Sequence, residues 1–94
     1  MQALMTPQLY ALERAMRVWA MTDETVAQGV RRSDQKVLAT LHQVFVDAGF
    51  DAEDAMVRAV AFFAAGMGFL HGVGQDIERP ADGVDRFLDF FLRP

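Results

Sequence analysis

The pattern of hydrophobic and polar positions along the chain predicts helices rather than strands. Apolar residues recur at spacings of three and four after Pro7, a residue that favours the first turn of a helix, and they predict a helix over residues 7–21. Thr22 and Asp23 can cap a short second helix. The stretch 29–33, which contains a glycine, is expected to interrupt or bend that helix.

Three further helices are predicted after this interruption. Ser33 or Asp34 starts the third helix, and Gly49 stands where a left-handed C-terminal cap belongs. Asp51 begins the fourth helix, and residues 81–92 form the last one. The sequence therefore predicts an all-α fold, a five-helix orthogonal or antiparallel bundle that forms a single domain over residues 1–94.

The fourth predicted helix has no polar face from Ala55 onward, and a helix that is apolar all round must be covered all round. Small residues recur along one side of it, where they let another helix approach closely. The last helix adds more aromatic surface, including Phe90, than a small monomer hides well. We therefore predict a homodimer whose interface contains Ala61, Ala64, Gly68, Gly72, Phe87, Leu88 and Phe91.

The composition is that of a small folded domain. Of the 94 residues, 52% are hydrophobic and 23% are charged, far from the composition of disordered chains. There is no cysteine, and the first residues lack a secretory signal, so we expect a cytoplasmic location. The longest apolar run, residues 59–70, is too short to cross a bilayer, so no membrane association is expected.

No arrangement of residues predicts catalysis, a metal or a cofactor. A di-metal carboxylate site needs Glu-x-x-His pairs, and no glutamate here has histidine at that position. The acidic stretch 47–54 has Ala52 and Arg58 where a calcium loop needs glycine and glutamate. The glycines near residue 70 close a helix instead of opening one, unlike a phosphate-binding loop. We therefore predict that the chain is not an enzyme.

Three consecutive segments carry a resemblance to a known family: LERAMRVWA (residues 12–20), DETVAQGVRRSDQKVLATL (residues 23–41) and AGFDAEDAMVRAVAFFAAGMG (residues 48–68). In their order and spacing they resemble the C-terminal regulatory domain of the TetR family of bacterial transcriptional regulators. The resemblance implies homodimers, in which the last two long helices of each subunit build a four-helix interface. It also implies that the preceding helices enclose a pocket for a small, usually apolar effector.

The resemblance also suggests which residues line that pocket. Bulky, adaptable side chains on three helices form the expected lining: Met16, Trp19, Leu41, Phe45, Phe63 and Met67. The alternative is that each is an ordinary core residue at helical spacing. His71 is either a surface or half-buried histidine, or a polar contact to the bound ligand.

The chain departs from the family pattern at both ends. The helix-turn-helix head is missing from these residues, and the last helix is shorter than the family usually shows. A net charge of −4 is also opposite in sign to that of a nucleic-acid binder, so we expect no DNA binding by this chain alone. The sequence thus predicts an effector-sensing and dimerisation domain without its own DNA-binding head. The alternative is a purely structural homodimerisation domain whose pocket is packed shut.

Overall fold

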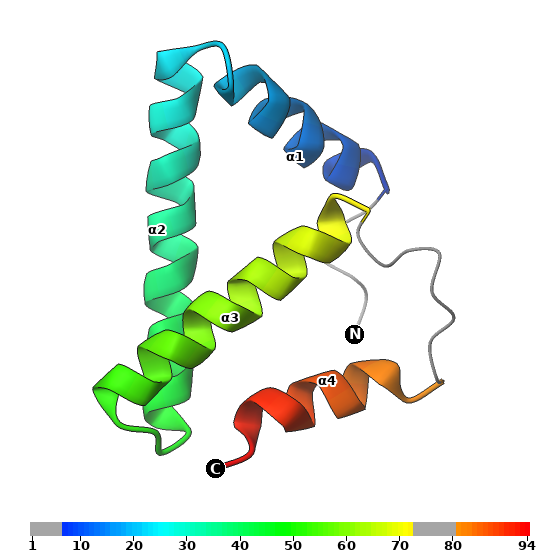
Figure 1. The fold of residues 1–94 in the computed structure, drawn as a ribbon. Coiled ribbons are helices and arrows are strands. Elements are labelled where there is room, and N and C mark those ends of the chain that lie inside the picture. The colour runs from blue at the N-terminus through cyan, green and yellow to red at the C-terminus, as the bar shows by residue number, and fades with distance from the viewer. Residues whose placement is uncertain (1–6, 73–80) are drawn as a thin grey trace. The chain divides into compact units, whose positions relative to one another are not determined.

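A computed structural model describes residues 7–72 and 81–94, and Figure 1 shows that they form helices joined by turns. The helices in these residues are α1 (Pro7–Ala20), α2 (Glu24–Asp47), α3 (Ala52–Leu70) and α4 (Gly83–Leu92). The predicted all-α class is therefore confirmed for the described residues. The chain forms two compact units, Met1–Lys36 and Val37–Pro94, and α2 begins in the first unit and ends in the second. The single domain over residues 1–94 stays a prediction.

The first unit contains α1 and the first half of α2. α1 ends in a tight turn, in which the backbone N–H of Asp23 donates to the carbonyl of Trp19 (3.1 Å). The Asp23 carboxylate then accepts a hydrogen bond from the N–H of Val26 (3.1 Å), which satisfies one of the free donors at the start of α2. The predicted first helix and the predicted cap at Asp23 are both confirmed.

The predicted break after Gly29 is wrong, because α2 continues without interruption through this stretch. The second and third predicted helices are therefore one, and the described residues hold four helices instead of five. A glycine inside a helix costs only about 1 kcal/mol relative to alanine, which tertiary contacts can offset. One such contact involves Asp34, which does not cap a new helix but binds Arg17 of α1 through its carboxylate.

The turn between α2 and α3 follows the predicted capping pattern. Gly49 adopts a positive φ of 108°, and the N–H of Phe50 donates to the carbonyl of Phe45 (3.2 Å), as in a Schellman motif. The rings of these two phenylalanines also meet edge to face, 6.1 Å apart. Asp51 then caps α3 by accepting a hydrogen bond from the N–H of Asp54 (2.8 Å). Local sequence alone therefore determines where α2 ends and α3 begins.

The core of the second unit lies where the end of α2 crosses α3. Phe45 of α2 is only 3% exposed and packs against Ala55 and Ala59 of α3, which are fully buried. Five partly buried side chains surround these three: Leu41, Val46, Phe50, Phe62 and Phe91. Among the described residues only these three are buried, so this part of the chain builds a small core.

α4 joins this core through aromatic rings. Phe87 and Phe91 each lie 5.3 Å from the ring of Phe62 on α3, measured between centroids. At the start of α4, Asp82 makes no side-chain cap and pairs instead with Arg86. Within the described ranges, no helix has the length and apolar character needed to span a membrane.

Candidate functional site

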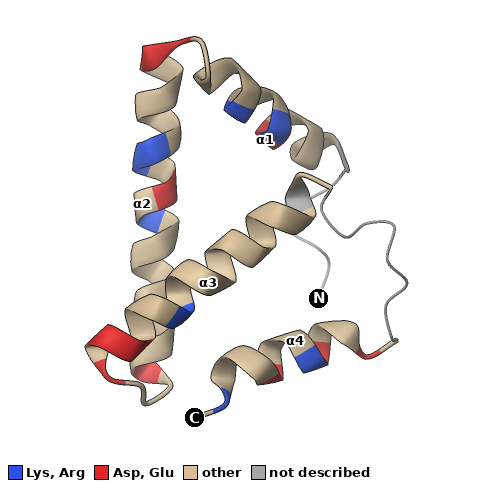
Figure 2. Ribbon diagram, in the orientation of Figure 1, with Lys and Arg blue, Asp and Glu red and all other residues tan. Residues whose placement is uncertain are grey.

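The outward side of α3 is apolar and exposed, and it is the strongest candidate for a binding surface. We define the outer α3 face as Val57, Val60, Ala61, Ala64 and Gly68. Val57 is 68% exposed, Val60, Ala61 and Ala64 are also exposed, and Gly68 is half-buried. Figure 2 shows α3 free of charge colours beyond its first turns, whereas α2 and α4 carry both signs. Such a surface is typical of an interface with another protein.

Arg58 is the one charged residue of α3 after its first turn, and its side chain is held within the chain. Its Nε donates to the carboxylate of Asp54 (3.1 Å), and its Nη1 donates to the backbone carbonyl of Phe91 (2.9 Å). The guanidinium also lies 3.8 Å from the centre of the Phe50 ring. Arg58 thus satisfies a carbonyl at the end of α4, where helix carbonyls lack partners within the helix, and leaves the outer α3 face uncharged.

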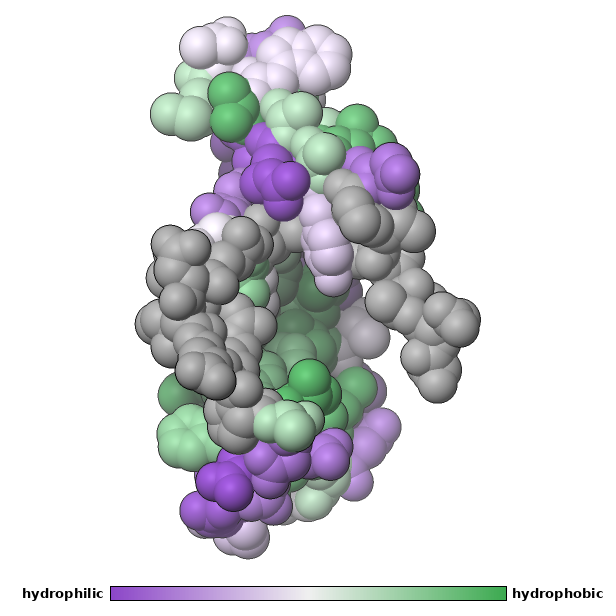
Figure 3. Space-filling model, turned by 90° about the vertical axis from the view of Figure 1, so that its right-hand side faces the viewer, coloured by the Kyte–Doolittle hydropathy of each residue, from purple (hydrophilic) through white to green (hydrophobic). Residues whose placement is uncertain are grey.

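An open groove next to this face extends the apolar surface onto α4. The groove measures about 400 Å³, and its lining includes Val57, Ala61 and Phe90. Phe90 is 68% exposed. At the height of α4, the space-filling view shows hydrophobic residues in green beside hydrophilic residues in purple (Figure 3). Val57, Ala61 and Phe90 therefore border one groove in the second unit, whose lining also contains the charged side chains of Asp54, Arg58 and Arg93.

The predicted interface residues fall into two groups. Ala61, Ala64 and Leu88 are exposed, as an interface requires of a free subunit. By contrast, Phe87 and Phe91 are half-buried against Phe62 of the same chain, so they contribute to the subunit's own core. The interface role predicted for these two rings stays a prediction.

Gly72 and Phe90 lie elsewhere than the predicted interface would place them. Gly72 lies beyond the end of α3 with a φ of 93°, so it terminates the helix and does not continue the small-residue row. The most exposed ring of α4 belongs to Phe90, which the sequence analysis counted in the aromatic surface that favours a dimer but did not place among the interface residues. The helical phase was the available signal, because Phe87 and Phe91 are four residues apart and share a side, whereas Phe90 points away from it.

The predicted effector residues are divided between the two units. Met16 and Trp19 belong to α1 in the first unit, where both are exposed. The other five lie in the second unit: Leu41, Phe45, Phe63, Met67 and His71. Leu41 and Phe45 are brought together in the core, and Phe63 and Met67 are half-buried at a spacing of four on α3. The predicted cavity lining stays a prediction.

The two histidines have structural positions. His71 is exposed at the C-terminal cap of α3, and its backbone N–H donates to the carbonyl of Met67 (3.0 Å). The His42 ring donates through Nε2 to the carbonyl of Ala52 (3.0 Å), which joins the end of α2 to the start of α3. In the part of the chain that the structure describes, no three histidine or acidic residues gather in a way that could hold a metal ion.

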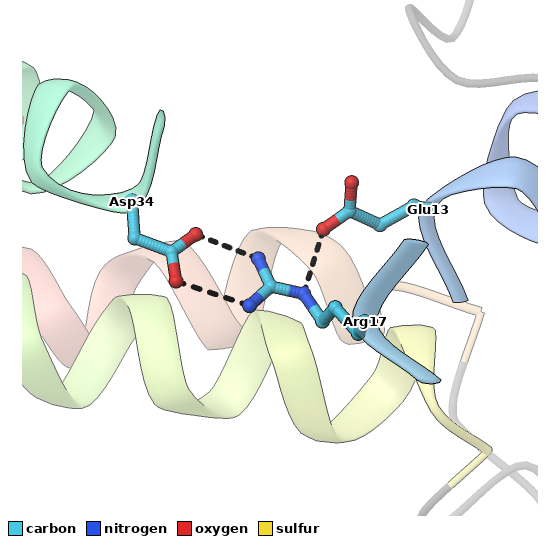
Figure 4. A network of polar contacts seen from close by, with 3 residues as sticks. All are labelled: Glu13, Arg17 and Asp34. Atoms are coloured by element: carbon cyan, nitrogen blue, oxygen red, sulfur yellow. Dashed lines mark hydrogen bonds and ion pairs between the residues drawn. The ribbon is translucent and has the colours of Figure 1, made fainter. Parts of the chain in front are cut away.

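A charged network in the first unit holds α1 against α2 (Figure 4). Arg17 binds the Asp34 carboxylate with two hydrogen bonds of 3.0 and 2.7 Å, and its Nε donates to Glu13 (2.7 Å). The hydrogen bonds with Asp34 raise the pKa of Arg17 above its usual value, so this guanidinium stays charged. A hollow of about 110 Å³ lies beside the network and includes Met16 in its lining. The arrangement is a two-pronged ion pair that fixes helix position.

Comparison of the chain with protein-family models, curated proteins and solved structures found no match. The resemblance to the TetR family therefore rests on the three sequence segments described above. The described residues share with that family only the all-helical class, and they show no further feature specific to it.

Proposed function

We propose that the chain is the effector-sensing and dimerisation domain of a TetR-like bacterial transcriptional regulator. The observation that carries the dimerisation part is the outer α3 face, where exposed valines and alanines lie beyond the acidic first turn of α3 and the only later charge, Arg58, is held within the chain. α3 is also one of the last two helices of the described chain, and the resemblance assigns the dimer interface to such helices.

The small core supports the same proposal. Among the described residues, Phe45, Ala55 and Ala59 alone are buried, and two of these three are alanines. A domain of this size buries too little apolar surface to be strongly stable by itself, and association with a second copy adds burial. The outer α3 face together with Phe90 supplies the surface for that association.

The dimerisation proposal predicts that stability depends on protein concentration, since association favours the folded state by mass action. We expect the thermal midpoint of the chain to rise with concentration. Ala64→Glu places a charge in the middle of the outer α3 face and should lower the midpoint and remove its concentration dependence. Ala39→Glu makes the same change at an exposed position of α2, and it should keep the wild-type behaviour.

A midpoint that does not change with concentration in any of the three proteins would contradict the dimer. Equal effects of the two substitutions would show that the added charge acts through helix stability and not through the outer α3 face. Circular dichroism at several concentrations supplies both readouts.

The effector part of the proposal rests on the resemblance and is tested through Trp19. This residue is the only tryptophan of the chain and is 57% exposed, so its fluorescence reports on binding near α1. A hydrophobic compound that binds should change this fluorescence, and at 100 times its dissociation constant it should stabilise the fold by about 2.7 kcal/mol. Hydrophobic probes that bind and stabilise would support an effector domain.

The alternative, a structural dimerisation domain without a ligand, is favoured by one observation. Phe45, one of the predicted lining residues, is closed in by Phe50 and Phe62, with ring centres 6.1 and 6.2 Å away. A side chain packed in this way leaves no room beside it for a ligand. Dimerisation without any stabilising hydrophobic compound would therefore favour this alternative.

A further inference from the structure

The side chains of the outer α3 face are larger toward one end of the helix, its large end, than toward the other, its small end. Val57 and Val60 lie toward the N-terminus of α3, and Ala64 and Gly68 lie toward its C-terminus. Apolar surfaces pack densely when large side chains on one partner meet small ones on the other. A copy of the face turned by 180° places valines over alanine and glycine, so the face is complementary to itself in that orientation.

The charged residues of α3 also lie toward its N-terminal end, as the larger residues of the outer α3 face do. Asp51, Glu53 and Asp54 stand at the N-terminal end, and residues 59–70 carry no charge. Two helices side by side in the same direction would bring both sets of carboxylates together, and like charges at close range repel. Helices in opposite directions keep the carboxylates apart and also align the helix dipoles favourably.

We infer that two copies of the chain pair through their outer α3 faces with the two α3 helices antiparallel, about a twofold axis that passes between Ala61 and Ala64. This inference rests on the proposed dimerisation. Val57 of one copy then packs against the partner's Gly68, and Ala61 packs against the partner's Ala64. Both copies use the same surface, as a closed dimer requires.

The open groove fits this arrangement. Val57 and Ala61 line the groove together with Phe90, whose ring is largely exposed in the single chain. In the antiparallel pair the small end of the partner's face lies above Val57. The Phe90 ring, which lies beside Val57 in the groove, is then covered by the small end of the partner's face.

Cysteine cross-linking separates this geometry from its alternatives, because the natural chain has no cysteine. Disulfides form when two Cα atoms lie within about 7 Å of each other. The double variant Val57→Cys/Gly68→Cys should therefore be converted to a covalent dimer by mild oxidation, and Val57→Cys alone should not. In a parallel pair, Val57→Cys alone would cross-link, because each position would face its own copy.

A distance measurement covers the case in which cysteine at position 68 disturbs packing. Spin labels on Val57→Cys should be separated by a backbone distance of about 17 Å. This follows from a rise of about 1.5 Å per residue and from facing Cα atoms about 5 Å apart when the helix axes are about 9 Å apart. A single-labelled Ala39→Cys protein serves as the control for a position off the face.

The outcomes distinguish the inference from the proposed function. A dimer in which Val57→Cys cross-links with itself, or in which the labelled backbone positions lie within about 7 Å of each other, overturns the antiparallel geometry and leaves dimerisation intact. A dimer that forms neither disulfide and gives a much longer label distance shows that another surface is used. A monomer at every concentration overturns both.

Discussion

The two sides of α3 are both apolar, yet the chain covers one and leaves the other exposed. On the inner side, Ala55 and Ala59 are fully buried against Phe45 of α2. On the outer side, Val57 and Val60 are exposed. The inner side has alanines where α2 crosses it, whereas the outer side has two valines followed by alanines and a glycine. An apolar pattern all round a helix predicts that both sides are covered, and we propose that a second copy covers the outer side.

The largest difference in stability is expected between a ring that packs on the inner side of α3 and a ring that lies beside the outer α3 face. Phe45→Ala should lower the free energy of unfolding by about 3–5 kcal/mol, because it empties the centre of the small core. Phe90→Ala removes an equally large ring from an exposed position, and in dilute solution it should change stability by less than about 0.5 kcal/mol. Urea denaturation of both variants gives the comparison. Equal losses at dilution would mean that the described core is not the stabilising one.

Overpacking of the inner side should have the next largest effect. Ala59→Leu inserts a larger side chain where α2 and α3 are in contact and should cost about 1–3 kcal/mol. Ala39→Leu makes the same change at an exposed position of α2 and should stay within about 0.5 kcal/mol of the natural chain. Thermal unfolding of the two variants measures the difference. A tolerated leucine at position 59 would contradict the close crossing of these helices.

Removal of the Arg58 side chain, which caps α4 and covers the Phe50 ring, should lower the free energy of unfolding by a smaller amount. Arg58→Ala removes the donor to the Phe91 carbonyl and the cover over the Phe50 ring, and it should cost about 1–2 kcal/mol. Arg86→Ala breaks an exposed ion pair with Asp82 and should cost at most about 0.5 kcal/mol. Denaturation at low and high salt compares them, since salt weakens only the exposed pair appreciably. Losses of the same size would show that Arg58 is an ordinary surface charge.

Local signals predicted the turn between α2 and α3 correctly. Gly49 and Asp51 act within a few residues of their own positions, so the sequence around them determines the cap. The continuity of α2 was missed for the opposite reason. Asp34 was expected to start a new helix, but its carboxylate accepts hydrogen bonds from Arg17, seventeen positions away, and no local rule connects these two residues.

The candidate surface was predicted in part. The absence of a polar face on α3 was readable from the sequence and leads directly to the outer α3 face. The sequence analysis counted Phe90 in the aromatic surface of the last helix, but it did not use the helical phase to separate this ring from Phe87 and Phe91, which pack against Phe62. The predicted lining residues on α1 and α3 belong to different compact units, so spacing along the chain could not bring them together.

The smallest predicted effect tests the continuity of α2. Gly29→Ala should raise stability by about 0.5–1 kcal/mol, because alanine favours the helix and loses less backbone entropy on folding. There is space for the added methyl group, whose nearest neighbour would be an Arg32 nitrogen 3.9 Å away. Gly49→Ala is the contrasting change, since Gly49 has a positive φ that alanine adopts poorly, and it should destabilise the chain. A destabilising Gly29→Ala would indicate that the helix does bend at this position.

The central claim is that the outer α3 face is covered by a second copy of the chain, and sedimentation equilibrium tests it most directly. The chain has a mass of 10.5 kDa, so a dimer has about 21 kDa. We expect the larger mass for the natural chain and for Ala39→Glu at micromolar concentration, and 10.5 kDa for Ala64→Glu. A natural chain that sediments at 10.5 kDa over the whole concentration range, with Val57 and Val60 left in water, would contradict the account.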